Sequence, residues 1–370
     1  MIGAELFCAE LERRGVGLVT GVPCAYFGGV LRLLDDQSDR YLPAANEGIA
    51  LAIAAGAELA GTRSAVLIQN SGFGNLLNPL TSLLLTFDIP LLVFMSLRGW
   101  PDPAADDPQH AVMGRSIFGL LDALDVPYTV LGPQPSDLVD ALNLADRARA
   151  DGKPAFVLVP KRTLAPAVEH TGPRVAFDRA AALDVLVPFL DDALVFGTTG
   201  YIGRELYARA DRPLTFYMQG SMGHALGLGL GAALAQPTRR VVVVDGDGAI
   251  LMHLGAMVTA GQAEPAGLVH VVLDNAAYES TGSQPTSSRT VDWVRLAGAA
   301  GYRSGSLCAS PKSFRAVLRA VRSMPGPHLV VARIGTSPGH LPPRVTTGLT
   351  PGALRARFQA AAAQPIGSCR

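Results

Sequence analysis

Short apolar runs that end at glycine, proline, asparagine or aspartate recur along the chain. They lie at 16–23, 64–72, 90–99, 154–161, 192–200, 239–248, 267–275 and 327–334. Runs that are apolar on both faces are typical of buried strands in parallel sheets. The alanine- and leucine-rich stretches between them, such as NEGIALAIAAGAELAG, are typical of helices that cover such a sheet. The pattern predicts an α/β fold with parallel sheets.

One stretch between the fourth and fifth runs breaks this pattern. In KRTLAPAVEHTGPRVAFD (161–178), prolines, a glycine and charges replace the apolar periodicity, as expected of an exposed linker. We therefore predict two α/β domains, at 1–165 and 181–370, joined by a linker at 166–180. No residue-level repeat relates the two halves.

Composition narrows the class of protein. A chain of 370 residues with 49% hydrophobic content can bury a large core. Lys+Arg and Asp+Glu are equal at 31 each, which favours a small-molecule partner over a nucleic acid. The four cysteines lack zinc-like spacing, which indicates free thiols in a reducing compartment. Neither a signal-peptide pattern nor a membrane-length apolar run is present, so we expect a cytoplasmic protein without a membrane partner.

Small polar residues cluster where strands of the second half are expected to end. Thr198 and Thr199 follow one strand, and Gly220 and Ser221 open a glycine-rich helical stretch. Ligands of open parallel sheets bind beyond the carboxyl ends of strands, where small residues let a phosphate approach the backbone. Taken singly, such clusters are more commonly turns and helix N-caps.

The stretch VVVVDGDG adds an acid at another strand end. Asp247, between Gly246 and Gly248, would repel a bare phosphate unless a divalent cation lay between them, and Mg²⁺ is commonly held by one or two protein oxygens plus a diphosphate. Asn275, at 275 − 247 = 28 positions further on, ends the next strand and offers a second oxygen. In isolation the first motif is typical of a tight turn and the second of a strand terminator. Their order and spacing favour a metal–diphosphate site.

This pair of motifs resembles the diphosphate-binding motif of thiamine diphosphate enzymes. Six segments, spread over most of the chain, are further similar to the phosphonopyruvate decarboxylase family, of which the sulfopyruvate decarboxylases are close relatives. The segments are NEGIALAIAAGAELAG, IQNSGFGNLLNPLTSL, RGWPDPAADDPQHAVMGR, GTTGYIGRELY, GSMGHALGLGLG and LDNAAYESTGSQPT.

The resemblance implies thiamine diphosphate and Mg²⁺ as cofactors. The first domain would bind the pyrimidine, with Glu47 against N1′ so that the imino tautomer forms and N4′ removes the proton from C2. The second would bind the diphosphate, with Asp247, Asn275 and the Ala277 carbonyl as Mg²⁺ ligands. The other implied cofactor-binding residues are Thr198, Thr199, Gly220, Ser221, Met222, Gly246, Gly248 and Ala249.

Two of these implied roles have ordinary structural alternatives. The Gly220 carbonyl would accept a hydrogen bond from N4′, and Met222 would be the apolar wedge that bends the cofactor. Met222 is equally consistent with a core residue at a helix start. Glu47 is equally consistent with a first-turn acid that complements a helix dipole.

The substrate implied by the resemblance is phosphonopyruvate, which would give phosphonoacetaldehyde and CO₂ in phosphonate biosynthesis. A phosphonate and a carboxylate need cationic or donor groups, and Arg98 and Gln109 are candidates in a loop after a strand. His110 is the candidate for protonating the carbon that loses CO₂. Asn70 and Ser71 are predicted to line the same pocket. Solvated loop residues and a strand-end turn are the structural alternatives.

Two departures from the family pattern leave the chemistry open. Cys24-Ala25 replaces an acid and a hydroxyl, and Tyr278 stands where histidine is expected. A sulfopyruvate decarboxylase, a carboligase and a catalytically silent binding subunit therefore remain alternatives. A nucleotide-binding dehydrogenase is disfavoured, because no G-x-G-x-x-G follows a strand with an acid about 20 residues on. The family also implies a homo-oligomer with active sites between chains.

Overall fold

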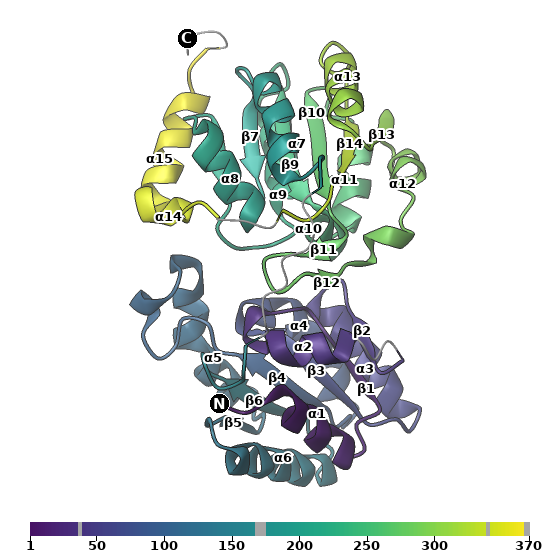
Figure 1. Cartoon of the computed structure of the whole chain (residues 1–370), viewed down its shortest axis with the longest axis vertical. Helices are drawn as coiled ribbons and strands as arrows, with labels where there is room; N and C mark the ends of the chain where they lie inside the picture. Colours follow the sequence, from purple (N-terminus) through teal and green to yellow (C-terminus); the bar gives the residue numbers. More distant parts are fainter. Residues whose placement is uncertain (36–38, 167–174, 338–340, 366–370) are drawn as a thin grey trace. The chain divides into compact units, whose positions relative to one another are not determined.

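The computed structural model describes residues 1–35, 39–166, 175–337 and 341–365. It separates into two compact units: Met1–His170 with Tyr278–Pro285, and Thr171–Ala277 with Thr286–Arg370. Each unit contains a parallel sheet with helices packed against it (Figure 1), which confirms the predicted α/β class. Much of the predicted linker, residues 167–174, lies outside the described part of the chain.

The first unit has a six-stranded sheet in the order β2-β1-β3-β4-β6-β5. Its strands are β1 (Leu18–Gly21), β2 (Tyr41–Pro43), β3 (Ser64–Gln69), β4 (Leu92–Ser96), β5 (Tyr128–Val130) and β6 (Ala155–Val159). Its main helices are α1 (Ala4–Arg13), α2 (Gly28–Asp35), α3 (Glu47–Leu59), α4 (Phe73–Pro79), α5 (Ala111–Ala123) and α6 (Pro135–Ala150). Its short helical turns are η1 (Ala25–Phe27), η2 (Asn70–Gly72), η3 (Leu80–Leu84), η4 (Pro103–Ala105) and η5 (Pro108–His110).

The second unit has a six-stranded sheet in the order β13-β14-β10-β9-β7-β8. Its strands are β7 (Leu194–Gly197), β8 (Thr215–Tyr217), β9 (Val241–Gly246), β10 (Leu268–Asp274), β13 (Ser304–Cys308) and β14 (His328–Arg333). Its helices are α7 (Arg179–Leu186), η6 (Val187–Phe189), α8 (Tyr201–Ala210), α9 (Ala225–Ala235), α10 (Asp247–Met252), α11 (Gly255–Ala263), η7 (Ser287–Thr290), α12 (Trp293–Ala299), α13 (Pro311–Val321), α14 (Val345–Gly348) and α15 (Pro351–Ala362). A small two-stranded sheet pairs β11 (Ala277–Tyr278) with β12 (Gln284–Pro285).

The two large sheets share one topology. If β7, β8, β9, β10, β13 and β14 are matched with β1 to β6 in chain order, both sheets have the strand order 2-1-3-4-6-5. In such sheets the strand order reverses between the first and third strands, and ligands bind beyond the carboxyl ends at that switch point. The switch points therefore lie between β1 and β3 in the first unit and between β7 and β9 in the second.

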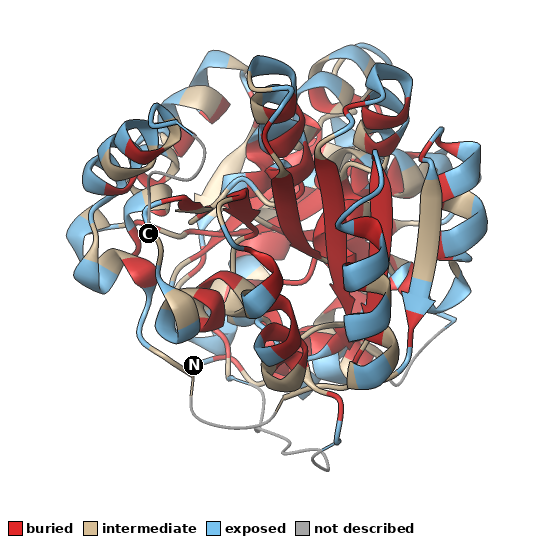
Figure 2. Cartoon of the chain, turned by 90° about the horizontal axis from the view of Figure 1, so that it is seen from above, coloured by how far each residue is buried: buried red, intermediate tan, exposed pale blue. Residues whose placement is uncertain are grey.

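The buried faces of β9 show why its run of four valines is continuous. β9 pairs with β7 on one side and β10 on the other. Val242 and Val244 pack into one hydrophobic cluster, whereas Val241 and Val243 pack into another. Figure 2 shows the resulting concentration of buried residues along the strands, with exposed residues on the outer sides of the helices. A strand with helices on both faces has no polar face.

Each of the eight predicted apolar runs contains a strand, namely β1, β3, β4, β6, β7, β9, β10 and β14. The pattern did not predict β2, β5, β8 or β13, which are the four edge strands. The glycine-rich helix predicted near residue 220 begins only at Ala225. None of the helices in the described residues combines the length and the apolar character needed to span a membrane. Cys8, Cys24 and Cys308 are free thiols, and Cys369 lies outside the described residues.

Candidate active site

Glu47 is the first residue of α3 and its side chain is buried. The residue is 5% exposed, and Asn75 Nδ2 donates a hydrogen bond of 2.7 Å to its Oε2. Burial raises the pKa of Glu47, and the hydrogen bond from Asn75 opposes that rise only in part. Glu47 is an acid in the first turn of α3, as in the helix-dipole alternative, but its burial and raised pKa distinguish it from an exposed first-turn acid. A carboxyl group in this state can share a proton with a ring nitrogen.

Gly72 provides the space that the Glu47 side chain occupies. A Cβ atom at position 72 would lie 2.0 Å from Glu47 Oε1, closer than real Cβ contacts. η2 carries Gly72 at the end of β3, so the switch-point loop shapes the pocket of the carboxyl group.

The ends of β1, β3 and β4 meet at Cys24. Its Sγ lies 3.1 Å from Ser96 Oγ and 3.5 Å from Gln69 Oε1. Burial raises the pKa of this thiol, so it is neutral and suits packing rather than nucleophilic attack. Gln69 Nε2 also donates to the hydroxyl of Ser71, which is exposed at the surface of the unit.

Asn70 ties the end of β3 to the chain after β4. Its Nδ2 donates to the Arg98 carbonyl at 2.9 Å, and the Arg98 main-chain N–H donates to its Oδ1 at 3.1 Å. This fully buried amide therefore holds two neighbouring loops together. Its predicted role in binding substrate remains a prediction.

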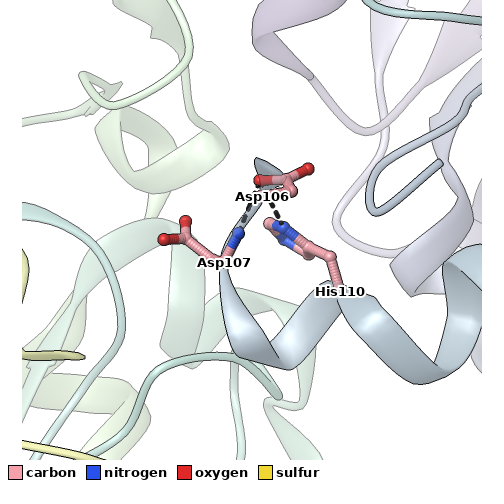
Figure 3. Close-up of side chains that lie close together, drawn as sticks. All are labelled: Asp106, Asp107 and His110. Carbon is pink, nitrogen blue, oxygen red and sulfur yellow. Dashed lines mark hydrogen bonds and ion pairs between the residues drawn. The ribbon is translucent and has the colours of Figure 1, made fainter. Parts of the chain in front are cut away.

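The Arg98 side chain is directed to Asp106. Nε donates to Oδ2 at 2.7 Å and Nη2 donates to Oδ1 at 2.6 Å. His110 Nδ1 lies 3.1 Å from the same Oδ1 (Figure 3). Burial alone would raise the pKa of Asp106, but the hydrogen bonds and charge of Arg98 hold it well below the usual range. This carboxyl group is thus an anion at neutral and at mildly acidic pH.

Asp106, Asp107 and His110 form a group whose side-chain ligand atoms all lie within 4.8 Å of one another, a spacing that can hold a metal ion. The Arg98 guanidinium already spans both oxygens of Asp106 and its charge would repel a cation. We therefore interpret the group as an ion-pair network. Gln109, the neighbour of His110, has a buried Oε1 without a hydrogen-bond partner in the described residues.

In the second unit, the end of β7 presents an unsatisfied hydroxyl. Thr198 is buried, and its Oγ1 has no hydrogen-bond partner among the residues described. Its main-chain N–H donates to the Val244 carbonyl of β9 at 2.8 Å, which places it at the switch point. Gly200, with φ 84° and ψ −148°, has a conformation that suits glycine. An orphan hydroxyl among small residues fits a phosphate oxygen.

Asp247 begins α10 directly after β9. Burial raises its pKa to about 6. The Thr286 hydroxyl donates a short hydrogen bond to Oδ2, and the Thr286 main-chain N–H donates to the Ala276 carbonyl at 3.1 Å. Thr286 therefore joins Asp247 to the loop after β10, which carries Asn275. A buried carboxylate of this kind fits a divalent cation.

The loop after β10 is a tight turn. Asn275 Oδ1 accepts from the Ala277 main-chain N–H at 3.1 Å, and Ala276 has a left-handed φ of 56°. This Asx turn ends β10, as in the strand-terminator alternative for Asn275, and the metal-ligand role of its side chain remains a prediction. Asp274 anchors the turn, because its Oδ1 accepts from the Ala276 N–H at 3.0 Å and from Ser288 Oγ at 2.8 Å.

The turn 220–224 precedes α9. Ser221 has a left-handed φ of 54°, and a Cβ at Gly223 would lie 2.6 Å from His253 Cδ2. Met222 is half-buried within this turn rather than in the core at a helix start. Gly220 and Thr199 are also half-buried, whereas Gly248 and Ala249 are buried inside α10.

Asn75, Asp106 and Thr286 were not among the predicted site residues. Asp106 had a usable signal, because it stands four positions before His110 and a carboxylate at that spacing can pair with an imidazole. Asn75 and Thr286 lie 28 and 39 positions from the carboxyl groups that they contact, and nothing in the local pattern indicates the pairing.

Comparisons with known proteins bear on this site. Residues 197–332 match the family model of the C-terminal domain of thiamine pyrophosphate enzymes. This domain binds thiamine pyrophosphate, which is thiamine diphosphate. The matched span runs from the end of β7 to β14 and includes Thr198, Asp247 and Asn275.

Whole-chain similarity extends the match to the first unit. The chain is 40% identical to a phosphonopyruvate decarboxylase of Streptomyces viridochromogenes, over 99% of this chain and 96% of the relative. It is 38% identical to a phosphonopyruvate decarboxylase of Streptomyces hygroscopicus, over 99% of this chain and 95% of the relative. It is 29% identical to a sulfopyruvate decarboxylase of Methanosarcina acetivorans, over 85% of this chain and 86% of the relative.

Proposed function

Because this chain belongs to the phosphonopyruvate decarboxylase family, whose members are thiamine diphosphate-dependent carboxy-lyases of 2-oxo acids, we propose that it converts phosphonopyruvate into phosphonoacetaldehyde and CO₂. The observation that carries this proposal is the similarity to the two Streptomyces relatives over nearly the entire chain. That similarity includes the first unit, where Glu47 and His110 lie. A place in phosphonate biosynthesis is part of the proposal.

The diphosphate end of the cofactor is assigned to the second unit. We propose Mg²⁺ ligation by Asp247, Asn275 and the Ala277 carbonyl, with Thr286 holding the second oxygen of Asp247. The Thr198 hydroxyl supplies a donor for a phosphate oxygen. The remaining proposed contacts are those of Thr199, Gly220, Ser221, Met222, Gly246, Gly248 and Ala249, with the Gly220 carbonyl facing N4′ and Met222 as the wedge.

The reaction needs an electron sink and two proton-handling groups. Bound thiamine diphosphate supplies the sink for the electrons released with CO₂. Glu47, with its raised pKa, holds a proton at the pyrimidine N1′. His110 delivers a proton to the substrate carbon that loses CO₂, so one proton is taken up for each aldehyde formed.

Recognition of the substrate anions is proposed for the loops after β3 and β4. Arg98 carries the positive charge there, although its Nε and Nη2 already bind Asp106. Gln109 can donate to an anion only through its carboxamide nitrogen, and Ser71 is exposed at the edge of the same loops. Asn70 positions the Arg98 backbone. The small buried thiol of Cys24 leaves the end of β1 uncharged, so the anions meet no carboxylate from that loop.

We also propose a homo-oligomer. One face of α3 exposes apolar and small residues at helical spacing, with Ile49 48% and Leu59 72% exposed and Ala52 and Gly56 between them. Exposed apolar helix faces of this kind are typical of subunit interfaces. A second copy of this chain is the proposed occupant, because no ligand class expected here is apolar.

The test is aldehyde formation by the cofactor-free protein, with thiamine diphosphate and Mg²⁺ added or omitted, from phosphonopyruvate and from sulfopyruvate in parallel. Cofactor-dependent phosphonoacetaldehyde is the expected result. Preference for sulfopyruvate would favour the alternative of a sulfopyruvate decarboxylase, which the similarity to the Methanosarcina relative supports. A product that appears only with an acceptor aldehyde would indicate a carboligase. Cofactor binding without any turnover would indicate a silent subunit.

A further inference from the structure

We infer that Asp106 is a positioning residue that fixes the tautomer of His110, so that Nδ1 carries the proton in the neutral ring and Nε2 is the atom that exchanges protons with substrate. The inference concerns the same site and rests on the proposed function of His110. It adds a residue that the sequence pattern did not single out, and it assigns Arg98 a second role.

The geometry around Asp106 leaves its carboxylate little freedom. Oδ2 accepts from Arg98 Nε at 2.7 Å and from the Gly99 main-chain N–H at 3.0 Å. Oδ1 accepts from Arg98 Nη2 at 2.6 Å and from the Asp107 main-chain N–H at 2.8 Å. Four donors thus hold the carboxylate in one orientation while Oδ1 also faces His110 Nδ1 at 3.1 Å.

The donors also determine the direction of the bond to His110. A carboxylate clamped by a guanidinium stays ionised and can only accept a hydrogen bond. The ring nitrogen that faces it must therefore donate, which places the proton of the neutral ring on Nδ1. Figure 3 shows the imidazole directed at Asp106, with a dashed line that marks the contact between the ring and the Asp106 carboxylate.

Burial and the charge of Arg98 favour a neutral resting ring. Arg98 and Asp106 face His110 directly, and Asp107 is the further acid that influences it. Cys24 and Tyr26 are the other titratable groups that interact electrostatically with Arg98 and Asp106. Both are uncharged, because burial raises their pKa values. Burial and the charge of Arg98 lower the pKa of His110, while Asp106 opposes that change.

The proton cycle then balances within this site. Nε2 takes a proton from solvent when the anionic substrate arrives, and Asp106 stabilises the imidazolium that results. Nε2 donates that proton to the substrate carbon as the electrons left by CO₂ form the new C–H bond. His110 returns to the neutral Nδ1–H form, and each turnover consumes one proton and releases one CO₂.

The experiment is ¹⁵N NMR of protein labelled at its seven histidines, with His110→Gln used to assign the His110 signals. At neutral pH the full-length protein is expected to show His110 as the Nδ1–H tautomer. In Asp106→Asn the new amide can donate to Nδ1, so the ring is expected to change to the Nε2–H tautomer. The kcat for aldehyde formation should fall by about 10²–10⁴, with the affinity for thiamine diphosphate and Mg²⁺ unchanged within about threefold.

Asp107→Asn is the matched control, because it removes the same charge at the next residue, whose Oδ2 lies 3.8 Å from Arg98 Nη2, compared with 2.6 Å for Asp106 Oδ1. It should keep the tautomer and most of the activity, and Asp106→Glu should restore part of both. A wild-type His110 that is already Nε2–H or protonated at neutral pH would overturn the inference, even if Asp106→Asn failed to fold. Equal effects of Asp106→Asn and Asp107→Asn on tautomer and kcat would overturn it as well.

These readouts separate the inference from the proposed function. If wild type forms no aldehyde from any 2-oxo acid while His110 shows the expected tautomer change, the proposed function fails and the positioning by Asp106 stands. If wild type forms aldehyde while the tautomer is unaffected by Asp106→Asn, the positioning fails and the proposed function stands.

Discussion

Glu47 and Asp106 are both carboxyl groups of the first unit, yet their surroundings drive their pKa values in opposite directions. Burial beside a single amide donor raises the pKa of Glu47. The fork of Arg98 and two main-chain N–H groups lower the pKa of Asp106. One group is therefore prepared to hold a proton and the other to remain an anion, and this division matches their proposed roles.

The raised pKa of Glu47 predicts how the cofactor-free protein responds to pH. The ionised form is disfavoured in the folded state, so Glu47 costs stability above its ordinary pKa of 4.5 and costs none well below it. Glu47→Gln should therefore raise the free energy of unfolding at neutral pH, by an amount that vanishes as the pH falls below about 4. Urea unfolding at several pH values measures this.

Glu5→Gln, at an exposed residue, is the control for that series. It should give no pH-dependent gain in the free energy of unfolding. With cofactors added, Glu47→Gln should lower kcat by about 10²-fold or more. If the Glu47→Gln variant were less stable than wild type at neutral pH, the buried carboxyl group would have a stabilising partner and the pKa direction would be wrong.

Gly72 and Gly74 offer a matched pair on one segment. A Cβ at position 72 would lie 2.0 Å from Glu47 Oε1, whereas one at position 74 has nothing within 4 Å. Gly72→Ala should destabilise the protein by about 1–3 kcal/mol through overpacking and impair catalysis by displacing Glu47. Gly74→Ala should stabilise α4 by about 0.5–1 kcal/mol. Thermal unfolding and kcat of both variants check this, and similar effects of the two would contradict the assigned contact.

At the scale of elements, the apolar pattern predicted the central strands of both six-stranded sheets but not their edge strands. β2, β5, β8 and β13 each pair with a neighbour on one side only. In β13 only Cys308 is buried, and in β5 none of the three residues is. An edge strand does not need a continuous apolar run, because part of it faces solvent. The long buried strands therefore carry a sequence signal that the short edges lack.

The loop between β10 and η7 illustrates how elements combine to make a site. Residues 278–285 belong to the first unit. Thr286, which follows them, belongs to the second unit and donates a hydrogen bond to Asp247. Thr286→Val removes the hydroxyl with little change in shape. The Kd for Mg²⁺ at saturating thiamine diphosphate should rise by about 10–100-fold, because partners that orient a metal ligand carry effects of that size.

Titration calorimetry measures the Kd for Mg²⁺ in Thr286→Val without relying on turnover. The neighbouring Ser287→Ala is the control, since Ser287 is exposed and accepts a hydrogen bond from the Thr290 hydroxyl through its main-chain carbonyl, which alanine retains. An unchanged Mg²⁺ affinity in Thr286→Val would show that the bond to Asp247 does not survive metal binding.

At the scale of the whole molecule, two units with one strand order are joined in a single chain. The shared order 2-1-3-4-6-5 places an equivalent switch point in each unit. The predicted pyrimidine residue Glu47 belongs to one unit and the predicted metal ligand Asp247 to the other. Each unit alone thus holds only part of the proposed cofactor site.

The exposed face of α3 predicts the assembly. Ile49→Asp and Leu59→Asp should shift the protein to a smaller species in light scattering coupled to gel filtration, because a buried charge disfavours an apolar interface. The stability of the first unit should change little, since both side chains are exposed in the single chain. Met324→Asp, at a residue 51% exposed after α13, is the control and should leave the assembly unchanged. A monomeric wild type with full activity would contradict the proposed homo-oligomer.

The sequence by itself determined the fold class, the central strands and which small and acidic residues stand at the strand ends. Continuous apolar runs can only be buried on both faces, and Gly-Asp-Gly with a later asparagine combines a close backbone approach with two oxygen ligands. These signals are local, so they can be read along the chain. They include Asp247, Asn275 and Thr198, which the fold places at the carboxyl ends of neighbouring strands.

Only the tertiary structure decided which groups meet. The pairing of Glu47 with Asn75, the close approach of Gly72 and the bond from Thr286 to Asp247 join residues of different elements. The clamp on Asp106 likewise showed that Arg98, a candidate substrate ligand, is also the partner of a carboxylate. Burial and contact of this kind depend on how strands and loops are arranged in space, and pKa values follow from them. A linear pattern records the residue types but not these distances.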